Sequence, residues 1–121
     1  MPPRSPKDRK KALRRGHVSE YLAALSLTLR GYRIVAMRYR VKSGEIDIIA
    51  RKRDVVSFIE VKARATTEAS VFAVDGWTQN RIRNASMFWL SSQKDAGLLS
   101  YSYDIVAVRP WRWPVHLRDA F

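Results

Sequence analysis

The sequence predicts an α/β fold in which helices pack on a single sheet. Apolar residues recur at spacings of three and four in residues 16–30 and 75–93, a pattern typical of amphipathic helices. Four other segments alternate apolar and polar residues, as half-buried strands do. Their order along the chain of 121 residues is helix, three strands, helix, strand. One sheet flanked by helices is the natural architecture for this order.

The first predicted helix, residues 16–30, has one apolar face. Gly31 follows it as a helix stop signal. Residues 32–40 then alternate in the manner of a strand. We expect the apolar face to pack on the sheet; it consists of Val18, Leu22, Leu25 and Leu29.

Two further strands form a predicted hairpin. Residues 41–44 turn the chain into a strand over residues 45–51, and residues 55–64 form the next strand. The polar, turn-like segment Arg51-Lys52-Arg53-Asp54 joins them. A hairpin places its two strands side by side, so side chains near Asp47 and Glu60 are expected to face each other.

The second half of the chain is predicted as loop, helix and strand. Residues 66–70 are loop-like, and residues 99–108 form the last strand, which Pro110 ends because proline cannot extend a central strand. The crossover to this strand is made by the second helix, residues 75–93. Its expected apolar positions are Ile82, Ala85, Phe88 and Trp89.

We predict one domain, residues 16–109, between two terminal segments. Residues 1–15 form a basic arm, expected to be mobile and to become helical near residues 10–15. The arm is either a solvated terminus or a grip on a polyphosphate. Residues 110–121 form a tail rich in Trp, Arg and Pro. In this tail Trp111 and Trp113 are expected to stack on bases, to pack against the sheet or to form a dimer interface.

Composition favours a polyanionic partner. The net charge is +12, of which the first fifteen residues carry +6, so the remainder is also basic. Nucleic acid is the commonest such partner and an anionic membrane surface the next. Cysteine is absent, which excludes disulfides and thiolate metal sites. No apolar run approaches ~20 residues and no secretory signal is evident, so we expect a cytoplasmic protein without membrane association.

Asp47, Glu60 and Lys62 form the candidate site. Glu60 and Lys62 share one strand face, and Asp47 lies mid-strand on the partner strand. Burying two carboxylates and an ammonium on an apolar sheet is costly, so a function that needs them is expected. Phosphodiester hydrolysis is such a function, because Asp47 and Glu60, with the Val61 carbonyl, would bind Mg²⁺ or Mn²⁺ while Lys62 orients or deprotonates water. The alternative is a cross-strand salt bridge on a solvated face.

Asp followed thirteen residues later by Glu-x-Lys on the next strand resembles the PD-(D/E)XK nuclease superfamily, in its Holliday-junction resolvase branch. More narrowly, the chain resembles the YraN family of small bacterial endonuclease-like proteins. The resemblance covers roughly residues 16–108. It rests on Gly16 with Glu20, Gly31-Tyr32, residues 44–50 and 58–64, Gln79 with Arg81-Ile82, and residues 104–108.

The resemblance implies a restriction-endonuclease-like αβββαβ core with a mixed sheet flanked by helices. It assigns Asp47 and Glu60 as metal ligands and Lys62 as the catalytic lysine. It also implies that Glu20 points from the first helix toward the metal and that Gln79 assists at the phosphate. The implied activity is metal-dependent, resolvase-like cleavage of structured, branched DNA. A homodimer would suit an enzyme that cuts two symmetric strands.

Two departures from the family pattern keep a second function open. Ile46 precedes Asp47 where the superfamily motif has proline, and Thr78 stands where relatives usually carry a lysine. The alternative is therefore a catalytically weak or inactive nucleic-acid-binding module on a nuclease fold. A third possibility is that the arm and tail dock on an acidic protein. His17 and His116 lack partners at metal-ligand spacing and are predicted to be surface or capping residues.

Overall fold

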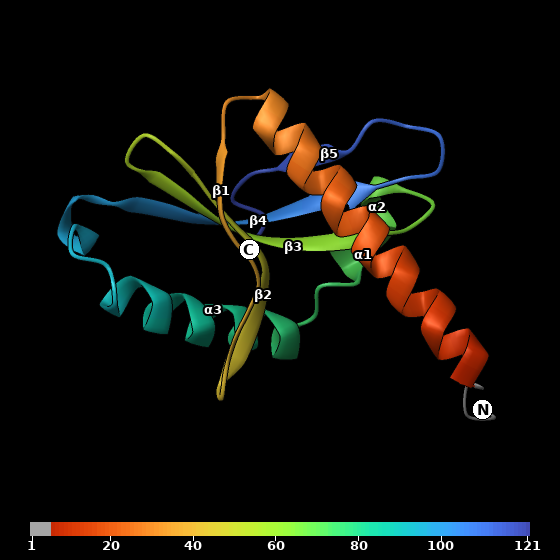
Figure 1. Ribbon diagram of the computed structural model, residues 1–121, viewed down its shortest axis with the longest axis horizontal. Coiled ribbons are helices and arrows are strands. Elements are labelled where there is room, and N and C mark those ends of the chain that lie inside the picture. Colours follow the sequence, from red (N-terminus) through yellow and green to blue (C-terminus); the bar gives the residue numbers. More distant parts are fainter. Residues whose placement is uncertain (1–5) are drawn as a thin grey trace.

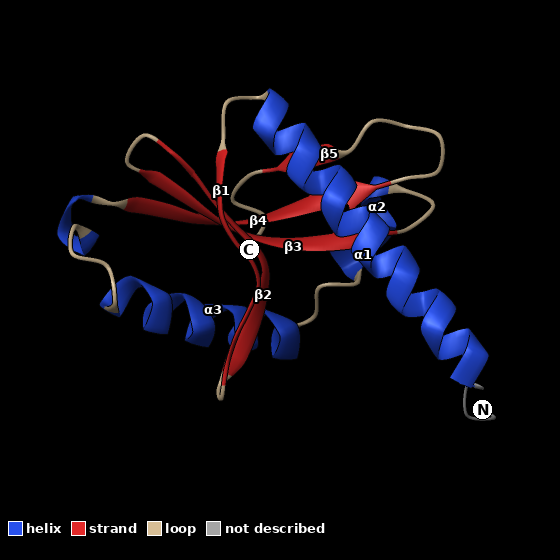
Figure 2. Ribbon diagram, viewed as in Figure 1, coloured by secondary structure: helices blue, strands red, loops and turns tan. Residues whose placement is uncertain are grey.

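The computed structural model describes the backbone of residues 6–121 and the side chains of residues 16–121. The predicted order of helix, three strands, helix and strand is present, with short elements added to it (Figure 2). The helices are α1 (Pro6–Leu29), α2 (Thr67–Phe72) and α3 (Gly76–Ser91), with a 3-10 turn at Ala96–Leu98. The strands are β1 (Arg33–Val41), β2 (Gly44–Lys52), β3 (Val55–Ala63), β4 (Ser100–Val108) and β5 (Val115–Leu117).

The five strands form one mixed sheet in the order β1-β2-β3-β4-β5. β1, β2 and β3 are consecutive and antiparallel, β4 runs parallel to β3, and β5 is antiparallel to β4. Parallel neighbours need a crossover connection, and α2 and α3 supply it between β3 and β4. This mixed sheet with flanking helices confirms the predicted α/β class.

Helices α1 and α3 cover opposite faces of the sheet (Figure 1). On the α1 face, Leu27 packs with Ile48 and Ile59. On the α3 face, Trp89 packs with Phe58, and their rings meet edge to face with centroids 5.8 Å apart. The core therefore consists of two apolar layers, with the sheet between them. Among the residues that the structure describes, no helix has the length and apolar character needed to cross a membrane.

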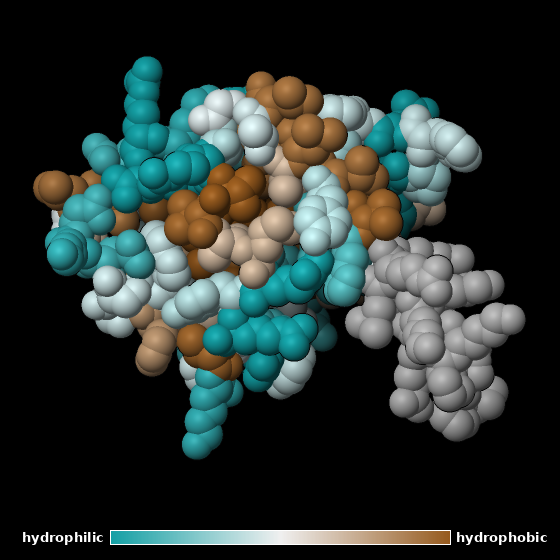
Figure 3. Space-filling model, viewed as in Figure 1, coloured by the Kyte–Doolittle hydropathy of each residue, from teal (hydrophilic) through white to brown (hydrophobic). Residues whose placement is uncertain are grey.

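The apolar face of α1 was predicted wrongly. Val18, Leu22, Leu25 and Leu29 are exposed rather than packed on the sheet, and Figure 3 shows hydrophobic atoms at the surface along this helix. The sheet beneath α1 is already filled by branched side chains, so small residues face it and allow a close approach. The buried positions of α1 are Ser19, Ala23, Ala24, Ser26 and Leu27. Phe88 of α3 was also predicted wrongly as a core position. It is exposed, whereas Ser86 of the same helix is buried.

Two short elements were missed in the sequence. α2 occupies residues expected to be loop, and the Thr66 side chain caps it by accepting a hydrogen bond from the Ala69 N–H at 3.1 Å. β5 lies beyond the prolines that end β4. Both elements are too short for apolar residues to repeat at the spacing of a helix or a strand. α1 also begins at Pro6, so the helix expected near residues 10–15 continues into the one from residue 16. Residues 1–5 of the predicted mobile arm lie outside the described residues.

A close approach between β2 and α3 fixes the start of β2. Gly44 is buried against the backbone of Arg81, and a Cβ at this position would overlap the Arg81 carbonyl. Glycine is therefore needed here for its size. The contact holds the first residue of β2, three residues before Asp47, against α3.

Candidate active site

The candidate site lies where β2 and β3 separate. Their ladder pairs Lys52 with Val55 and continues to Ile48 opposite Ile59. Asp47, the residue of β2 that precedes Ile48, is joined to β3 by its side chain. Its Oδ2 accepts a hydrogen bond from the Val61 N–H at 2.9 Å. A carboxylate thus takes the place of a backbone acceptor, and the strands part at this point.

Glu60 and Lys62 lie on β3 beside this opening. The Lys62 Nζ is 3.3 Å from the Glu60 Oε1. The Glu60 side chain is 11% exposed and that of Lys62 22%, so the pair is largely withdrawn from water. The three predicted residues therefore come together in the structure. A solvated surface salt bridge, the alternative interpretation, does not describe a pair buried to this degree.

Both carboxyl groups of the site have raised pKa values. Burial raises the pKa of Asp47 to about 6, against the hydrogen bond from Val61, which lowers it. Burial, and then the charge of Asp47, raise the pKa of Glu60 to about 8, while Lys62 acts in the opposite direction. Two negative charges at this position are thus unfavourable without additional positive charge.

The donor set of the site fits a hard divalent cation. Carboxylate oxygens are the ligands that Mg²⁺ and Mn²⁺ prefer, and two carboxylates on adjacent strands match the small number of protein ligands that Mg²⁺ usually takes. A cation would also supply the positive charge that the two carboxylates lack. Within the described part of the chain, no group of three or more His, Cys, Asp or Glu side chains is arranged to hold a metal ion together. Asp47 and Glu60 are therefore the side chains available, and the Val61 carbonyl remains a predicted ligand.

Glu20 extends from α1 toward the same region, but an arginine pairs with it. The Arg38 Nε donates a hydrogen bond to the Glu20 Oε2 at 2.7 Å. The charge of Glu20 still contributes, after burial, to the raised pKa of Asp47, which places the two carboxylates near each other. Glu20 thus reaches the edge of the site as a member of an ion pair.

Gln79 lies near the start of α3 and makes local hydrogen bonds. Its Nε2 donates to the Val74 carbonyl at 3.2 Å, and its Oε1 accepts from the Arg83 Nη1 at 3.4 Å. These contacts support the beginning of α3. A role for Gln79 at the phosphate remains a prediction from the resemblance.

Two polar residues near the site were not singled out in the sequence. Arg38 binds Glu20 and has a φ of +51°, and its buried Nη2 has no hydrogen-bond partner among the described residues. Asp75 caps α3 by accepting the Thr78 N–H at 2.8 Å; that bond, with a smaller contribution from the charge of Lys62, lowers the Asp75 pKa. The helix start signal at Asp75 was visible in the sequence. The position of Arg38 depends on how β1 and α1 pack, for which the sequence carries no local signal.

The prediction for His116 was wrong. Its Nε2 lies 2.7 Å from the Oδ2 of Asp104, and both side chains are buried. Burial alone would raise the pKa of Asp104, but the hydrogen bonds from His116 and the Asp119 N–H lower it overall. This pair joins β4 to β5 at the far edge of the sheet from β1. We assign it a structural role.

A mixed five-stranded sheet with helices on both faces is consistent with a restriction-endonuclease-like fold. Within that class, the chain belongs to the uncharacterised protein family UPF0102, whose model matches residues 19–108. It is similar to the UPF0102 protein of Rhizobium meliloti (strain 1021), with 65% identity covering 92% of this chain and 91% of the relative. The UPF0102 protein of Agrobacterium fabrum is 58% identical, covering 93% of each chain. The relative from Mesorhizobium japonicum is 51% identical and covers 100% of this chain and 97% of its own length.

The family match confirms the resemblance to YraN-like proteins, and the PD-(D/E)XK superfamily assignment is consistent with this family. The matched region contains Glu20, Asp47, Glu60, Lys62 and Gln79.

Proposed function

We propose that this protein is a metal-dependent endonuclease that hydrolyses phosphodiester bonds in structured, branched DNA. The observation that carries the proposal is the pair of carboxylates where β2 and β3 part: Asp47 is half-buried, Glu60 is buried, and Lys62 lies 3.3 Å from Glu60. The net charge of +12 supports a polyanionic substrate. The resemblance to resolvase-like nucleases supports branched DNA as the substrate class.

In this proposal Asp47 and Glu60 hold Mg²⁺ or Mn²⁺, and Lys62 acts on the attacking water. The bound cation would lower the pKa of water and neutralise charge on the phosphate. The Val61 N–H fixes one oxygen of the Asp47 carboxylate, so that side chain is oriented before any ligand binds. Lys62 Nζ, directed by Glu60, can hold a proton of the water as its oxygen bonds to phosphorus. The phosphorus–oxygen bond to the leaving group then breaks, and that oxygen takes up a proton from a solvent water molecule.

Cleavage of a labelled panel tests this function. The panel contains duplex, single strand, flap and four-way junction DNA, each with Mg²⁺, with Mn²⁺ and with a chelator. We expect wild type to cut with metal, with Asp47→Asn/Glu60→Gln inactive. Glu45→Gln is the matched control, because Glu45 is an exposed carboxylate on the same strand, paired with Arg40 at 3.3 Å. Cutting that survives in the double variant would exclude this site.

A second candidate function is nucleic-acid binding without cleavage. The net charge of +12 favours binding of a polyanion whether or not the site is catalytic. Thr78, at the position where the resemblance expects lysine, also favours binding without cleavage. Salt-sensitive binding that is equal in wild type and Asp47→Asn/Glu60→Gln, with no metal-dependent cutting by either, would favour it over the enzyme.

A further inference from the structure

Arg38 on β1 lies opposite Asp47 on β2. The register of these antiparallel strands is the same on both sides of this position, where it pairs Met37 with Ile48 and Tyr39 with Ile46. Arg38 and Asp47 are the residues between these pairs. The strand next to a proposed metal ligand thus carries a cation at the same level of the sheet.

Two features of Arg38 are unfavourable for stability. Its φ of +51° lies in the left-handed region, which glycine or asparagine adopts at lower cost than a long side chain. Its Nη2 is buried and has no hydrogen-bond partner among the described residues, and a buried donor left unpaired costs free energy. Strain and an unpaired donor in one residue beside a candidate site are typical of a residue kept for function.

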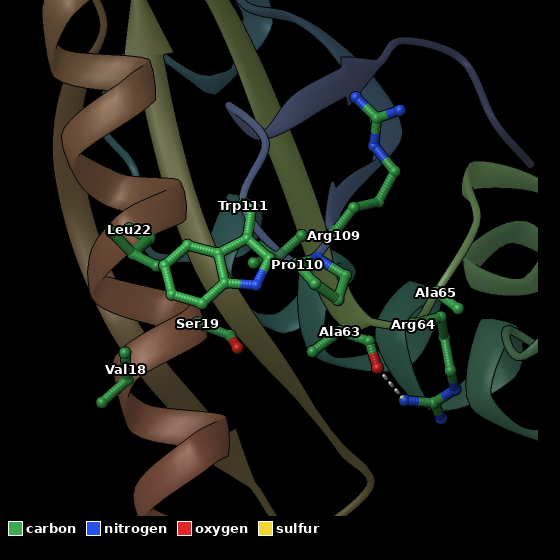
Figure 4. A pocket seen from close by; sticks show the side chains of 10 residues that line it. Val18, Ser19, Leu22, Ala63, Arg64, Ala65, Arg109, Pro110 and Trp111 are labelled. Carbon is green, nitrogen blue, oxygen red and sulfur yellow. Dashed lines mark hydrogen bonds between the residues drawn. The ribbon is translucent and has the colours of Figure 1, made fainter.

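Glu20 orients the guanidinium of Arg38. The Arg38 Nε donates to the Glu20 Oε2 at 2.7 Å, and the two Nη groups of the fork carry further N–H donors. Figure 4 shows Ser19, which precedes Glu20 on α1, beside a groove that Arg64 also lines. Glu20 is not part of that lining and reaches β1 instead. The Arg38 side chain is still 32% exposed, so an acceptor from outside can reach it.

The side chains of β3 alternate between the two faces of the sheet. Ile59 and Val61 lie in the apolar layer under α1, and Phe58 lies in the layer under α3. Glu60 and Lys62 are two and four residues after Phe58, so they point to the α3 face.

Arg38 and Glu20 reach the site from the α1 face, and Asp47 joins the two sides. Burial is the main cause of both raised pKa values, but the charge of Glu20 adds to that of Asp47 and the charge of Asp47 to that of Glu60. Asp47 is therefore near carboxylates from both faces, at the point where β2 and β3 part. A phosphate that enters there has Lys62 on one side of the sheet and Arg38 on the other.

We propose that Arg38 is a substrate-binding residue of this site and donates hydrogen bonds to the phosphate that is cut. The inference rests on the proposed function and adds a residue to its site. Arginine suits this role because its planar fork donates two parallel N–H groups to phosphate oxygens. The pair with Glu20 holds the fork in place before the substrate arrives, so less side-chain freedom is lost on binding.

The test measures DNA binding in the Asp47→Asn/Glu60→Gln background with a chelator present, so that neither cleavage nor a metal ion contributes. Fluorescence anisotropy follows a labelled four-way junction over a range of salt concentrations. Arg38→Gln should weaken binding about tenfold and lower the slope of log affinity against log salt by about one, as the loss of one phosphate contact does. Arg33→Gln is the matched control, because Arg33 is exposed at the other end of β1. An unchanged affinity in Arg38→Gln, or an equal loss in Arg33→Gln, would overturn the proposal.

Glu20→Gln separates substrate binding from a structural role. If the ion pair served stability alone, removing either partner would change DNA binding alike. If Arg38 binds phosphate, Glu20→Gln should instead tighten binding, because glutamine keeps an oxygen for the Nε and removes a negative charge beside the phosphate. Equal weakening in Glu20→Gln and Arg38→Gln would overturn the proposal.

Arg38→Asn guards against a loss of binding that is caused by unfolding. Asparagine tolerates the left-handed backbone, so this variant should unfold at a urea concentration no lower than that for Arg38→Gln and bind the junction as weakly. If Arg38→Asn binds like its parent, Arg38 does not hold the phosphate.

The outcomes also separate this proposal from the proposed function. If Arg38→Gln binds the junction like its parent, the assignment of Arg38 fails, whether or not wild type cleaves DNA. If wild type cuts no substrate but Arg38→Gln loses affinity and salt dependence, Arg38 stands as a phosphate-binding residue and the nuclease fails.

Discussion

The carboxylate of Asp47 accepts the hydrogen bond from the Val61 N–H that a neighbouring strand would otherwise accept, at a distance of 2.9 Å. One side chain therefore serves the sheet and the candidate site together. Substitutions of Asp47 affect stability and activity by separate routes, and these routes can be measured apart.

We expect Asp47→Asn and Asp47→Ala to abolish cleavage equally and to differ in stability. Asparagine keeps an oxygen for the Val61 N–H and removes a charge whose burial is unfavourable, so its free energy of unfolding at pH 7 should equal or exceed that of wild type. Alanine leaves the N–H without a partner, which costs about 1–3 kcal/mol relative to asparagine. Urea unfolding measures both values. A fully stable Asp47→Ala would show that the Val61 hydrogen bond contributes nothing.

The contribution of Asp47 and Glu60 to the stability of the protein should fall as pH rises from about 4 to about 8. Burial raises the pKa of Asp47 from 3.8 to about 6, and burial with the Asp47 charge raises that of Glu60 from 4.5 to about 8. The folded state therefore binds more protons than the unfolded state in this range, and the contribution of the pair is greatest at low pH. The melting temperature of wild type minus that of Asp47→Asn/Glu60→Gln should decrease steadily across it. A difference that does not change with pH would contradict the raised values.

Divalent cations should stabilise the protein, and more strongly as the carboxyl groups ionise. Mn²⁺ or Mg²⁺ at one hundred times its dissociation constant adds about 2.7 kcal/mol to the free energy of unfolding. The rise in melting temperature should be larger at pH 8 than at pH 6, be reversed by a chelator and be absent from Asp47→Asn/Glu60→Gln. Glu45→Gln should respond like wild type. An equal rise in the double variant would place the bound cation elsewhere.

Gly44→Ala should be strongly destabilising, because its Cβ would overlap the Arg81 carbonyl. We expect a loss of about 3 kcal/mol, at the upper end of the range for overpacked cores. Gly76→Ala is the control, since no atom of the described residues lies within 4 Å of a Cβ placed there. It should change the free energy of unfolding by less than about 1 kcal/mol. If both variants unfold at the same urea concentration, β2 and α3 do not approach closely at Gly44.

The sequence predicted the main elements because each has a period that the chain repeats several times. The meeting of Asp47 with Glu60 and Lys62 also followed from local information, since a hairpin brings its own strands together. Features that depend on packing between distant elements were not predictable. Val18 and Leu22 are as apolar as any core residue, and their exposure results from the sheet accepting the small side of α1. The pairs Glu20 with Arg38 and Asp104 with His116 join segments that no local pattern connects.

Small side chains hold α1 to the sheet, and this sets how easily the helix can open. Between residues 16 and 29, alanines and serines make up most of its buried face, and each contributes little apolar area. The free energy of detaching α1 should accordingly lie well below that of unfolding the sheet, and its amide hydrogens should exchange with solvent sooner than those of β3 and β4. Glu20 travels with this helix. The acidic edge of the site thus belongs to a helix that opens locally. Asp47, Glu60 and Lys62 belong to β2 and β3, which stay folded when the helix opens.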